Sequence, residues 1–595
     1  MKLSDYVFSF LKTKGINTVF YLAGGGCMHL LDSLGASGDV QAVALLHEQA
    51  VAVAAEAFAN VSGDAGAALV TTGPGGTNAV TGVLAAYLDS VPCFFISGQV
   101  KTADLKSRYG VRALGSQEAD IVSIVTPVTK YAVMVTDKSR VRYHMERAWH
   151  EMMSGRRGPV WVDIPLDVQG AQIEPGELEG YTPQSEDNHR EGSHCDVMQI
   201  IAALNDSKRP VIMAGNGLSK CRSRFNELID YLQIPIIPTW KAMDYMPNEH
   251  PLYAGRSGGM GDRHGNLAVQ NADLILSLGS RLDFSITGYE RAEWASKAKK
   301  FIVEIDPAEI AKLEGVSDLV PIAADAADVV EALLSRRGDI RVGGAEREAW
   351  RKRIDGWKAM YPVVTGEKYI TEQGKLTAYA FVDVLCKYLH EGAIVAPCSA
   401  GTTAEIFFQA FTVKRNQVVR SNHGLGSMGF EIPNAIGMCI ASGGKDTVCI
   451  AGDGGMQLNI QELAVVSGRK LPIKIFVINN GGYASIRNMQ NNHFHSRHAG
   501  CDEGSGLFLP KMQDVAAAYK LSYFFADNVE ALDSSVKSAL SQPGPVICEI
   551  AVDSKCLVTP RTATQVMPDG TMRSSPLENQ FPFLPEEEVE RNMRV

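Results

Sequence analysis

Two short polar motifs follow apolar segments in the last third of the sequence. The motif GDGG at 452–455 comes after DTVCIA, and NNGG at 479–482 comes after LPIKIFVI. A carboxylate oxygen from Asp453 and an amide oxygen from Asn480 suit a hard cation such as Mg²⁺, with a backbone carbonyl and phosphate oxygens completing the shell. The glycines let the backbone approach a diphosphate closely. These residues predict a cradle for a metal ion and a diphosphate.

A strand-helix-strand unit must position the two motifs. We expect strands over 446–454 and 472–480, and a helix over 456–470 between them. Both motifs then lie at the carboxyl ends of parallel strands, where open α/β sheets bind their ligands.

Similar alternation of apolar runs and helical patterns covers most of the chain. It predicts an α/β protein of three doubly wound parallel-sheet domains at 1–171, 193–335 and 370–556, with a linker over 173–192. The tail, 557–595, contains aromatic residues and leucines, and we expect it to lie over the body. The expected strands are residues 17–25, 40–48, 65–76, 92–99 and 158–165 in the first domain; 209–217, 233–240, 272–282 and 299–307 in the second; and 392–399, 446–454, 472–480 and 545–553 in the third.

Composition excludes several classes of protein. The formal net charge is −10 and the basic residues are scattered, which argues against a nucleic-acid partner. No apolar run is long enough to span a bilayer, and the N-terminus lacks a signal-peptide pattern. The eleven cysteines show no zinc spacing and predict reduced core thiols. We expect a cytoplasmic protein that acts away from membranes.

The two motifs and their spacing match the signature of thiamine diphosphate enzymes, and nearly the whole chain resembles the acetohydroxyacid synthase (acetolactate synthase) family, in particular its large catalytic subunit. The resemblance implies a pyrimidine-binding first domain, a central domain and a diphosphate-binding third domain. It makes the side chains of Asp453 and Asn480 and the carbonyl of Gly482 ligands of Mg²⁺. It also implies a homodimer or homotetramer, because each cofactor is held between the first domain of one subunit and the third domain of another.

Glu48 stands where an apolar strand ends and a helix begins, and it matches the family glutamate that bonds the aminopyrimidine. Thiazolium C2 is a weak acid, so a glutamate that helps to move its proton would be catalytic. The alternative is a carboxylate that only stabilises a helix N-terminus. For Met428, the family role is an apolar prop that bends the cofactor, and the alternative is a core methionine. By resemblance, further cofactor-binding residues are Gly24, Pro74, Asn78, Gly401, Thr402, Gly452, Gly454, Gly455 and Tyr483.

Family members differ in whether a proton or a second carbonyl receives the acyl unit. Decarboxylases of the superfamily carry an acidic residue in the loop after the first strand, where this chain has Gly25. A later histidine pair of the decarboxylases is replaced by Ser116 and Gln117, and Gln117 matches a glutamine of the synthases. These residues favour carboligation. Arg281 matches a synthase arginine near the acceptor or the flavin, and its alternative is a surface salt bridge.

Three departures from the synthases leave the acceptor open. Ser116 replaces a phenylalanine, Met489 replaces a tryptophan, and Gly401-Thr402-Thr403 replaces a Gly-Gln-His run. We expect a carboligase that decarboxylates a 2-oxo acid, pyruvate above all, and transfers the acyl unit to a carbonyl acceptor. A keto sugar nucleotide as acceptor is one alternative, and a non-catalytic degenerate homologue is another. FAD in the central domain also stays open, because the segment TWKAMDYMP at 239–247 departs from the flavin-binding members.

Overall fold

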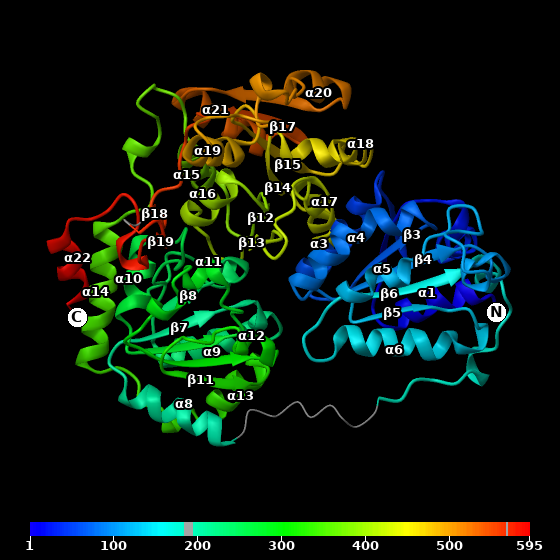
Figure 1. Ribbon diagram of the computed structural model, residues 1–595, viewed down its shortest axis with the longest axis horizontal. Coiled ribbons are helices and arrows are strands. Elements are labelled where there is room, and N and C mark those ends of the chain that lie inside the picture. The colour runs from blue at the N-terminus through cyan, green and yellow to red at the C-terminus, as the bar shows by residue number, and fades with distance from the viewer. Residues whose placement is uncertain (184–193, 567–568, 595) are drawn as a thin grey trace. The chain divides into compact units, whose positions relative to one another are not determined.

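The computed structural model describes residues 1–183, 194–566 and 569–594, shown in Figure 1. Its main strands form three parallel sheets with helices around them, which confirms the predicted α/β class. Of the linker expected at 173–192, residues 184–192 lie outside the described part of the chain. None of the described helices combines the length and apolar character that a bilayer crossing requires.

The first sheet has the strand order β2-β1-β3-β4-β6-β5. Helices α1, α2, α6 and α7 pack against one another beside an apolar core, while α3, α4 and α5 form a second group. The strands are β1 (Thr18–Tyr21), β2 (Gln41–Ala44), β3 (Gly66–Val70), β4 (Cys93–Gln99), β5 (Tyr131–Met134) and β6 (Val160–Pro165). The helices are α1 (Leu3–Thr13), α2 (Met28–Ala36), α3 (Glu48–Ser62), α4 (Pro74–Leu88), α5 (Ile121–Val125), α6 (Val141–Met153) and α7 (Leu166–Gln169).

The second sheet has the order β11-β10-β9-β7-β8, with a separate apolar core on each side. One core involves α8, α9 and α13, and the other involves α10, α12 and α14. The strands are β7 (Pro210–Ala214), β8 (Ile236–Pro238), β9 (Leu274–Leu278), β10 (Lys299–Glu304) and β11 (Leu319–Ala323). The helices are α8 (His194–Asp206), α9 (Arg222–Leu232), α10 (Arg263–Asn271), α11 (Phe284–Thr287), α12 (Pro307–Ala311), α13 (Ala326–Ser335) and α14 (Ala345–Met360).

In the third sheet, β12, β14, β15, β17 and β16 follow one another in that order. Helix α17 packs on β12 and β14, and α20 and α21 pack on β16 and β17. The strands are β12 (Ile394–Ala396), β13 (Val418–Val419), β14 (Thr447–Gly452), β15 (Ile473–Asn479), β16 (Ser522–Ala526) and β17 (Val546–Ala551). The helices are α15 (Ala378–Tyr388), α16 (Thr402–Ala410), α17 (Glu431–Ala441), α18 (Leu463–Gly468), α19 (Ala484–His493), α20 (Met512–Ala518) and α21 (Val529–Ser541).

The connection from β14 to β15 differs from the single helix expected over 456–470. It is the 3-10 helix η12 (Gly455–Glu462), interrupted at Asn459, followed by the short α18. Asn459 leaves helical geometry with φ −136°, and its side-chain amide donates a hydrogen bond to the carbonyl of Gly429. This polar contact holds the backbone in the irregular conformation.

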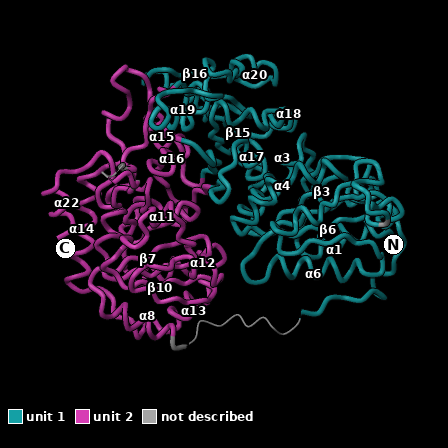
Figure 2. Tube along the Cα trace, viewed as in Figure 1, with its two compact units in different colours: residues 1–186, 393–401, 420–551 teal, residues 187–392, 402–419, 552–595 magenta. Residues whose placement is uncertain are grey.

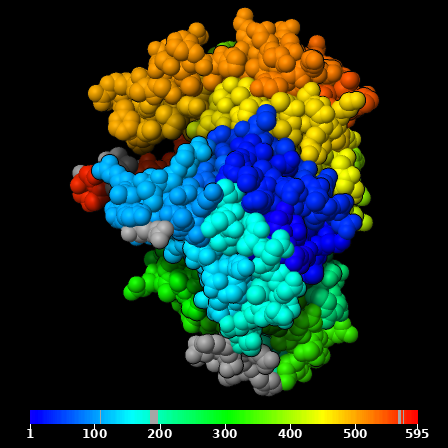
Figure 3. All heavy atoms as spheres, turned by 90° about the vertical axis from the view of Figure 1, so that its right-hand side faces the viewer, coloured from blue at the N-terminus to red at the C-terminus, as the bar shows by residue number. Residues whose placement is uncertain are grey.

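Contacts divide the chain into two compact units, coloured in Figure 2. Unit 1 comprises residues 1–186, 393–401 and 420–551, and therefore joins the first sheet to most of the third. Within unit 1, α3 packs against α17, and Figure 3 shows yellow residues of the third sheet region against blue residues of the first. A Cβ at Gly437 would lie 2.3 Å from the carbonyl of Ala54, so small residues permit this close contact.

Unit 2 comprises residues 187–392, 402–419 and 552–595, so the C-terminal tail belongs to the same compact unit as the second sheet. The tail forms the hairpin of β18 (Thr564–Val566) and β19 (Met572–Ser574) and then α22 (Glu586–Met593). Asn592 of α22 is buried, and its side-chain carbonyl accepts a hydrogen bond from the indole of Trp357 at 3.1 Å. These contacts dock the end of the tail on α14.

Candidate cofactor and metal site

Asp453 connects the loops that follow β14 and β15. Its two carboxylate oxygens accept hydrogen bonds from the backbone amides of Gly454, at 2.8 Å, and Gly482, at 2.9 Å. Burial raises the pKa of the Asp453 carboxyl to about 6 despite these hydrogen bonds. A buried carboxylate without a basic side chain bonded to it is well suited to a cation.

Asn480 offers a second oxygen from the loop after β15, which Asp453 contacts through the amide of Gly482. Its side-chain Oδ1 is buried and has no hydrogen-bond partner among the described residues. The guanidinium of Arg487 donates instead to the backbone carbonyls of Asn480, at 3.3 Å, and Gly481, at 2.9 Å. An orphaned amide oxygen beside a buried carboxylate fits a hard cation, with Asp453, Asn480 and the Gly482 carbonyl as the residues that would hold it.

Glycines shape the backbone around these oxygens. A Cβ at Gly454 would lie 2.6 Å from the Tyr483 ring, and a Cβ at Gly482 would lie 2.3 Å from the carbonyl of Cys501. Larger residues are therefore excluded at both positions. By contrast, a Cβ at Gly452 would meet no atom within 4 Å, and one at Gly401 would meet only Ser485 Oγ at 3.5 Å. The backbone at these two glycines is therefore not crowded, and its contact with a diphosphate stays a prediction.

Glu48 is the first residue of α3 and is buried, with 7% of its surface exposed. Its Oε2 accepts a hydrogen bond from Asn78 Nδ2 at 3.0 Å, so two residues predicted to bind the cofactor lie in contact. Asn78 lies on α4, which begins at Pro74. The helix that carries Glu48 is capped by His47, whose Nδ1 accepts a hydrogen bond from the amide of Gln49.

The loop after β1 lies against the loop after β3. The amide of Gly26 donates to Thr71 Oγ1 at 3.1 Å, and a Cβ at Gly24 would lie 2.4 Å from Thr71. Between these crowded positions, a Cβ at Gly25 would meet no described atom within 4 Å. Gly25, which we expect to replace the acid of the decarboxylases, is therefore not crowded by the described atoms.

Gln117 lies beside the same loops. A Cβ at Gly73 would lie 2.2 Å from the Gln117 carbonyl, and Gln117 itself has φ 62°. Both Ser116 and Gln117 are exposed in the single chain. The neighbouring Glu118 fixes this segment, because its carboxylate accepts hydrogen bonds from the amides of Lys106 and Leu114.

Comparison with known proteins gives consistent matches along the chain. Three family models of thiamine pyrophosphate enzymes match this chain. They are the N-terminal TPP binding domain at residues 1–124, the central domain at 197–333 and the C-terminal TPP binding domain at 399–550. The acetolactate synthase large subunit of Porphyra purpurea is 30% identical, covering 91% of this chain and 90% of the relative. The chain belongs to the acetolactate synthase family of thiamine diphosphate enzymes.

Other family members extend this similarity. The large subunit of Corynebacterium glutamicum is 33% identical over 84% of this chain and 78% of the relative. Isozyme 1 of Escherichia coli is 29% identical over 94% of this chain and 95% of the relative. The clusters around Glu48 and Asp453 thus lie in the two thiamine diphosphate-binding domains of this acetolactate synthase family member.

Four predicted residues are less clearly tied to these clusters. Arg281 belongs to unit 2, where its guanidinium pairs with Asp283 at 2.7 Å, so the salt-bridge alternative has direct geometric support. Thr402 begins α16, also in unit 2. Met428 and Met489 are 41% and 39% exposed in the single chain. Their contact with cofactor or acceptor stays a prediction.

The structure adds two buried acids that sequence reasoning missed. Glu462 accepts a hydrogen bond from the amide of Leu46 at 3.0 Å, two residues before Glu48. Glu431, the first residue of α17, has its Oε1 3.8 Å from a Cβ at Gly455. Burial raises the pKa of both carboxyls to about 7. The signal for Glu431 was a lone acid within the apolar run MGFEIPNAIG.

Proposed function

We propose that this protein is a thiamine diphosphate-dependent carboligase. It decarboxylates a 2-oxo acid, pyruvate above all, and transfers the acyl unit to the carbonyl carbon of an acceptor. The bond between the donor's carbonyl carbon and its carboxylate breaks and releases CO₂. One carbon-carbon bond then forms between the acyl unit and the acceptor. The donor and the acyl transfer go beyond what the name acetolactate synthase says of its relatives.

The observation that carries this proposal is the open position at Gly25. A proton donor in the loop after β1 would favour release of an aldehyde, and Gly25 supplies none. Because no described atom lies within 4 Å of a Cβ at Gly25, a second substrate has room beside the loop. The exposed Ser116 and Gln117 add no acid to this region.

Each cluster has a distinct task in the proposal. When bound, thiamine diphosphate supplies a nucleophilic carbon that attacks the donor's carbonyl. Glu48 holds or moves a proton at the aminopyrimidine, and Asn78 orients its carboxylate. Asp453, Asn480 and the carbonyl of Gly482 would hold Mg²⁺, whose charge would offset that of the diphosphate. The subunits assemble as a homodimer or homotetramer.

Product analysis tests the proposal directly. Purified protein is incubated with pyruvate, thiamine diphosphate and Mg²⁺, and CO₂ release and products are followed by mass spectrometry. Pyruvate alone should give acetolactate if a second pyruvate is the acceptor. Release of acetaldehyde as the main product with every acceptor would contradict carboligation, and no CO₂ from any simple 2-oxo acid would contradict decarboxylation.

A keto sugar nucleotide is the second candidate acceptor. Ser116 and Met489 replace two larger aromatic residues of the synthases, and both are exposed in the single chain, which favours a wider acceptor site. The same assay with a panel of keto sugar nucleotides should then give an adduct that carries the extra two-carbon unit. The intact contact of Glu48 with Asn78 argues against a non-catalytic homologue.

FAD in the central domain is a separate proposal. The visible absorption spectrum of the protein as purified tests it, because a bound flavin gives a characteristic band that is released on denaturation. Family membership alone supports this cofactor, and the altered segment at 239–247 is the reason to measure it.

A further inference from the structure

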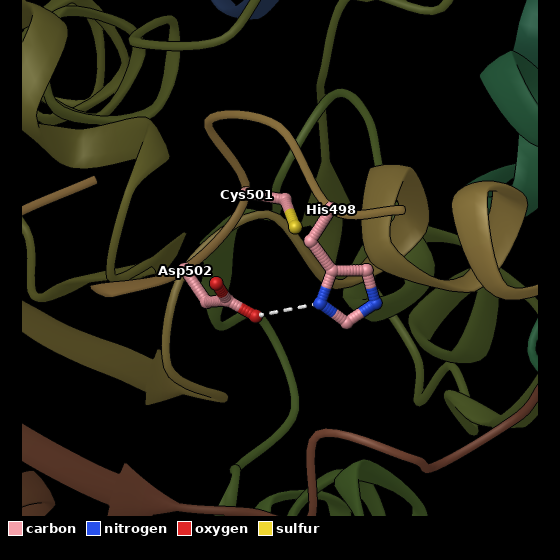
Figure 4. A group of neighbouring side chains, drawn as sticks. All are labelled: His498, Cys501 and Asp502. Carbon is pink, nitrogen blue, oxygen red and sulfur yellow. Dashed lines mark ion pairs between the residues drawn. The ribbon is translucent and has the colours of Figure 1, made fainter. Parts of the chain in front are cut away.

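The segment after α19 is rich in side chains that bind soft metal ions. Three of the chain's thirteen histidines, His493, His495 and His498, lie within six residues of one another, and Cys501 and Asp502 follow shortly afterwards. Of these, His498, Cys501 and Asp502 come together. Their ligand atoms all lie within 4.8 Å of one another, and Figure 4 shows the three side chains pointing toward a common centre.

The orientation of His498 suits metal binding. Its Nε2 lies 2.7 Å from Asn491 Oδ1, which can only accept, so Nε2 carries a proton and, in the neutral imidazole, Nδ1 presents its lone pair. Nδ1 lies 3.4 Å from Asp502 Oδ2. Two ligand atoms bound to a tetrahedral zinc ion at about 2.0–2.2 Å are themselves about 3.4 Å apart. A histidine fixed by a second hydrogen bond is typical of protein metal sites.

Cys501 provides the third ligand. Its side chain is buried, and among the described residues its sulfur accepts one hydrogen bond, a long one of 3.5 Å from the hydroxyl of Ser505. The partly exposed His498 and Asp502 leave a path for an ion to enter from solvent. A nitrogen, a thiolate and a carboxylate with a water in the fourth position form a ligand set that zinc accepts.

We propose that His498, Cys501 and Asp502 form a binding site for a thiophilic divalent cation such as Zn²⁺, distinct from the Mg²⁺ site. On binding, the Cys501 thiol loses its proton to water and the sulfur bonds the ion. The ligand types differ from the all-oxygen set at Asp453 and Asn480, so the two sites select different metals.

The cation site adjoins the loop proposed to hold Mg²⁺. Asp502 pairs with Arg487 at 3.4 Å, and Arg487 donates to the carbonyls of Asn480 and Gly481. The Cys501 carbonyl accepts a hydrogen bond from the amide of Tyr483 at 2.9 Å. A cation bound to Asp502 would compete with Arg487 for that carboxylate. This link to the cofactor loop rests on the proposed function, whereas binding itself does not.

The test uses tag-free, full-length protein saturated with thiamine diphosphate and Mg²⁺, so that the hard-cation site is filled. Zn²⁺ affinity is measured by competition with a chromophoric chelator, and Co²⁺ serves as a spectroscopic probe of the thiolate. His498→Ala is the deciding variant, because the histidine is exposed and its removal should leave the fold intact. His493→Ala, on the same segment but outside the cluster, is the matched control.

We expect one Zn²⁺ site whose affinity falls at least tenfold in His498→Ala and stays unchanged in His493→Ala. The thiolate-to-Co²⁺ charge-transfer band should disappear in Cys501→Ser. Equal Zn²⁺ affinity in the wild type and His498→Ala would overturn the proposal, and so would a charge-transfer band that persists in Cys501→Ser. These binding readouts do not depend on turnover, so they separate failure of this site from failure of the proposed carboligation.

Discussion

Acidic side chains around the predicted cofactor site are held by amide groups. Asp453 accepts from the backbone of Gly454 and Gly482, Glu462 from the backbone of Leu46, and Glu48 from the side chain of Asn78. Amides fix the orientation of a carboxyl group without neutralising it, unlike a lysine or arginine. Each acid therefore keeps its proton or its charge available for a ligand.

Replacing Glu48 by glutamine tests its role most directly. Glu48→Gln preserves size and the possibility of a hydrogen bond with Asn78, but it removes the exchangeable acid. We expect turnover to fall by roughly 10²–10⁴-fold, the usual contribution of a positioned acid or base. Thiamine diphosphate affinity and the circular dichroism spectrum should change little.

A suitable control is Glu530→Gln, since Glu530 occupies the first turn of α21 and is exposed. Its turnover should equal that of the wild type. Undiminished turnover in Glu48→Gln would remove this residue from the mechanism.

An acid placed at Gly25 should change the product. In Gly25→Asp, the new carboxyl has space and can deliver a proton, so the ratio of aldehyde to carboligation product should rise on the order of tenfold. Gly35→Asp is the matched control, because Gly35 is exposed on α2 and a Cβ there also meets no atom within 4 Å. An unchanged ratio, measured by mass spectrometry, would show that Gly25 does not face the reacting carbon.

The sequence alone predicted the polar residues that follow strands. Asp453, Asn480 and Glu48 each follow an apolar run, and such positions gather at one edge of a parallel sheet. Glu462 was missed because its hydrogen bond with the Leu46 amide is a tertiary contact that no local pattern records, whereas Glu431 stood out locally as a lone acid in an apolar run and was overlooked.

At the scale of elements, the strands of the three large sheets that sequence reasoning missed all lie at sheet edges, although the edge strands β2 and β8 were predicted. β5, β11 and β16 end their sheets, and every residue of β5 is only partly buried. An edge strand pairs with one neighbouring strand instead of two. It can therefore lack the continuous apolar run that identified the central strands. The irregular η12 was missed for another reason, since its break depends on the distant carbonyl of Gly429.

Strands β4 and β6 are joined by a buried acid. Asp163 accepts hydrogen bonds from Ser97 Oγ at 2.6 Å and Gln99 Nε2 at 3.0 Å, and burial raises its pKa to about 7. Between its ordinary pKa near 4 and about 7, the native state holds a proton that the unfolded state has released. Asp163 therefore lowers the stability of the native state progressively as pH rises through this window.

Asp163→Asn removes this titration. The melting temperature of Asp163→Asn minus that of the wild type should increase from pH 4 to pH 7, measured by differential scanning fluorimetry. Asp167→Asn is an opposite control: although partial burial opposes it, hydrogen bonds from Thr102 hold the pKa of Asp167 below its ordinary value. For that variant the difference should decrease as pH rises toward about 4, the ordinary pKa of an aspartate, and should change little between pH 4 and pH 7.

Helix α22 is anchored through Asn592. Its side chain accepts from Trp357 Nε1 and donates to the hydroxyl of Tyr361 at 2.7 Å. Asn592→Ala leaves the buried indole N–H without this partner, which costs about 1–3 kcal/mol. The melting temperature should fall by about 2–5 °C. Arg594→Ala, which alters an exposed residue of the same tail, should leave it unchanged.

On the scale of the whole molecule, family membership predicts that a single subunit is inactive. Specific activity should therefore fall when the enzyme is diluted below the dissociation constant of its dimer, and analytical ultracentrifugation should show monomers over the same concentrations. Excess thiamine diphosphate and Mg²⁺ should shift the dissociation to lower concentration, because ligands held between subunits favour assembly. Constant specific activity in a demonstrated monomer would contradict the prediction.

The packing of α3 on α17 has a consequence for protein synthesis. The two helices begin roughly 380 residues apart, and a ribosome adding about 5–20 residues per second needs on the order of 20–80 s to make that interval. During this time the small-residue face of α3 has been made while its partner has not. This face of α3 therefore stays without its partner helix until residue 441 leaves the ribosome. Chaperone demand should be greatest during that interval.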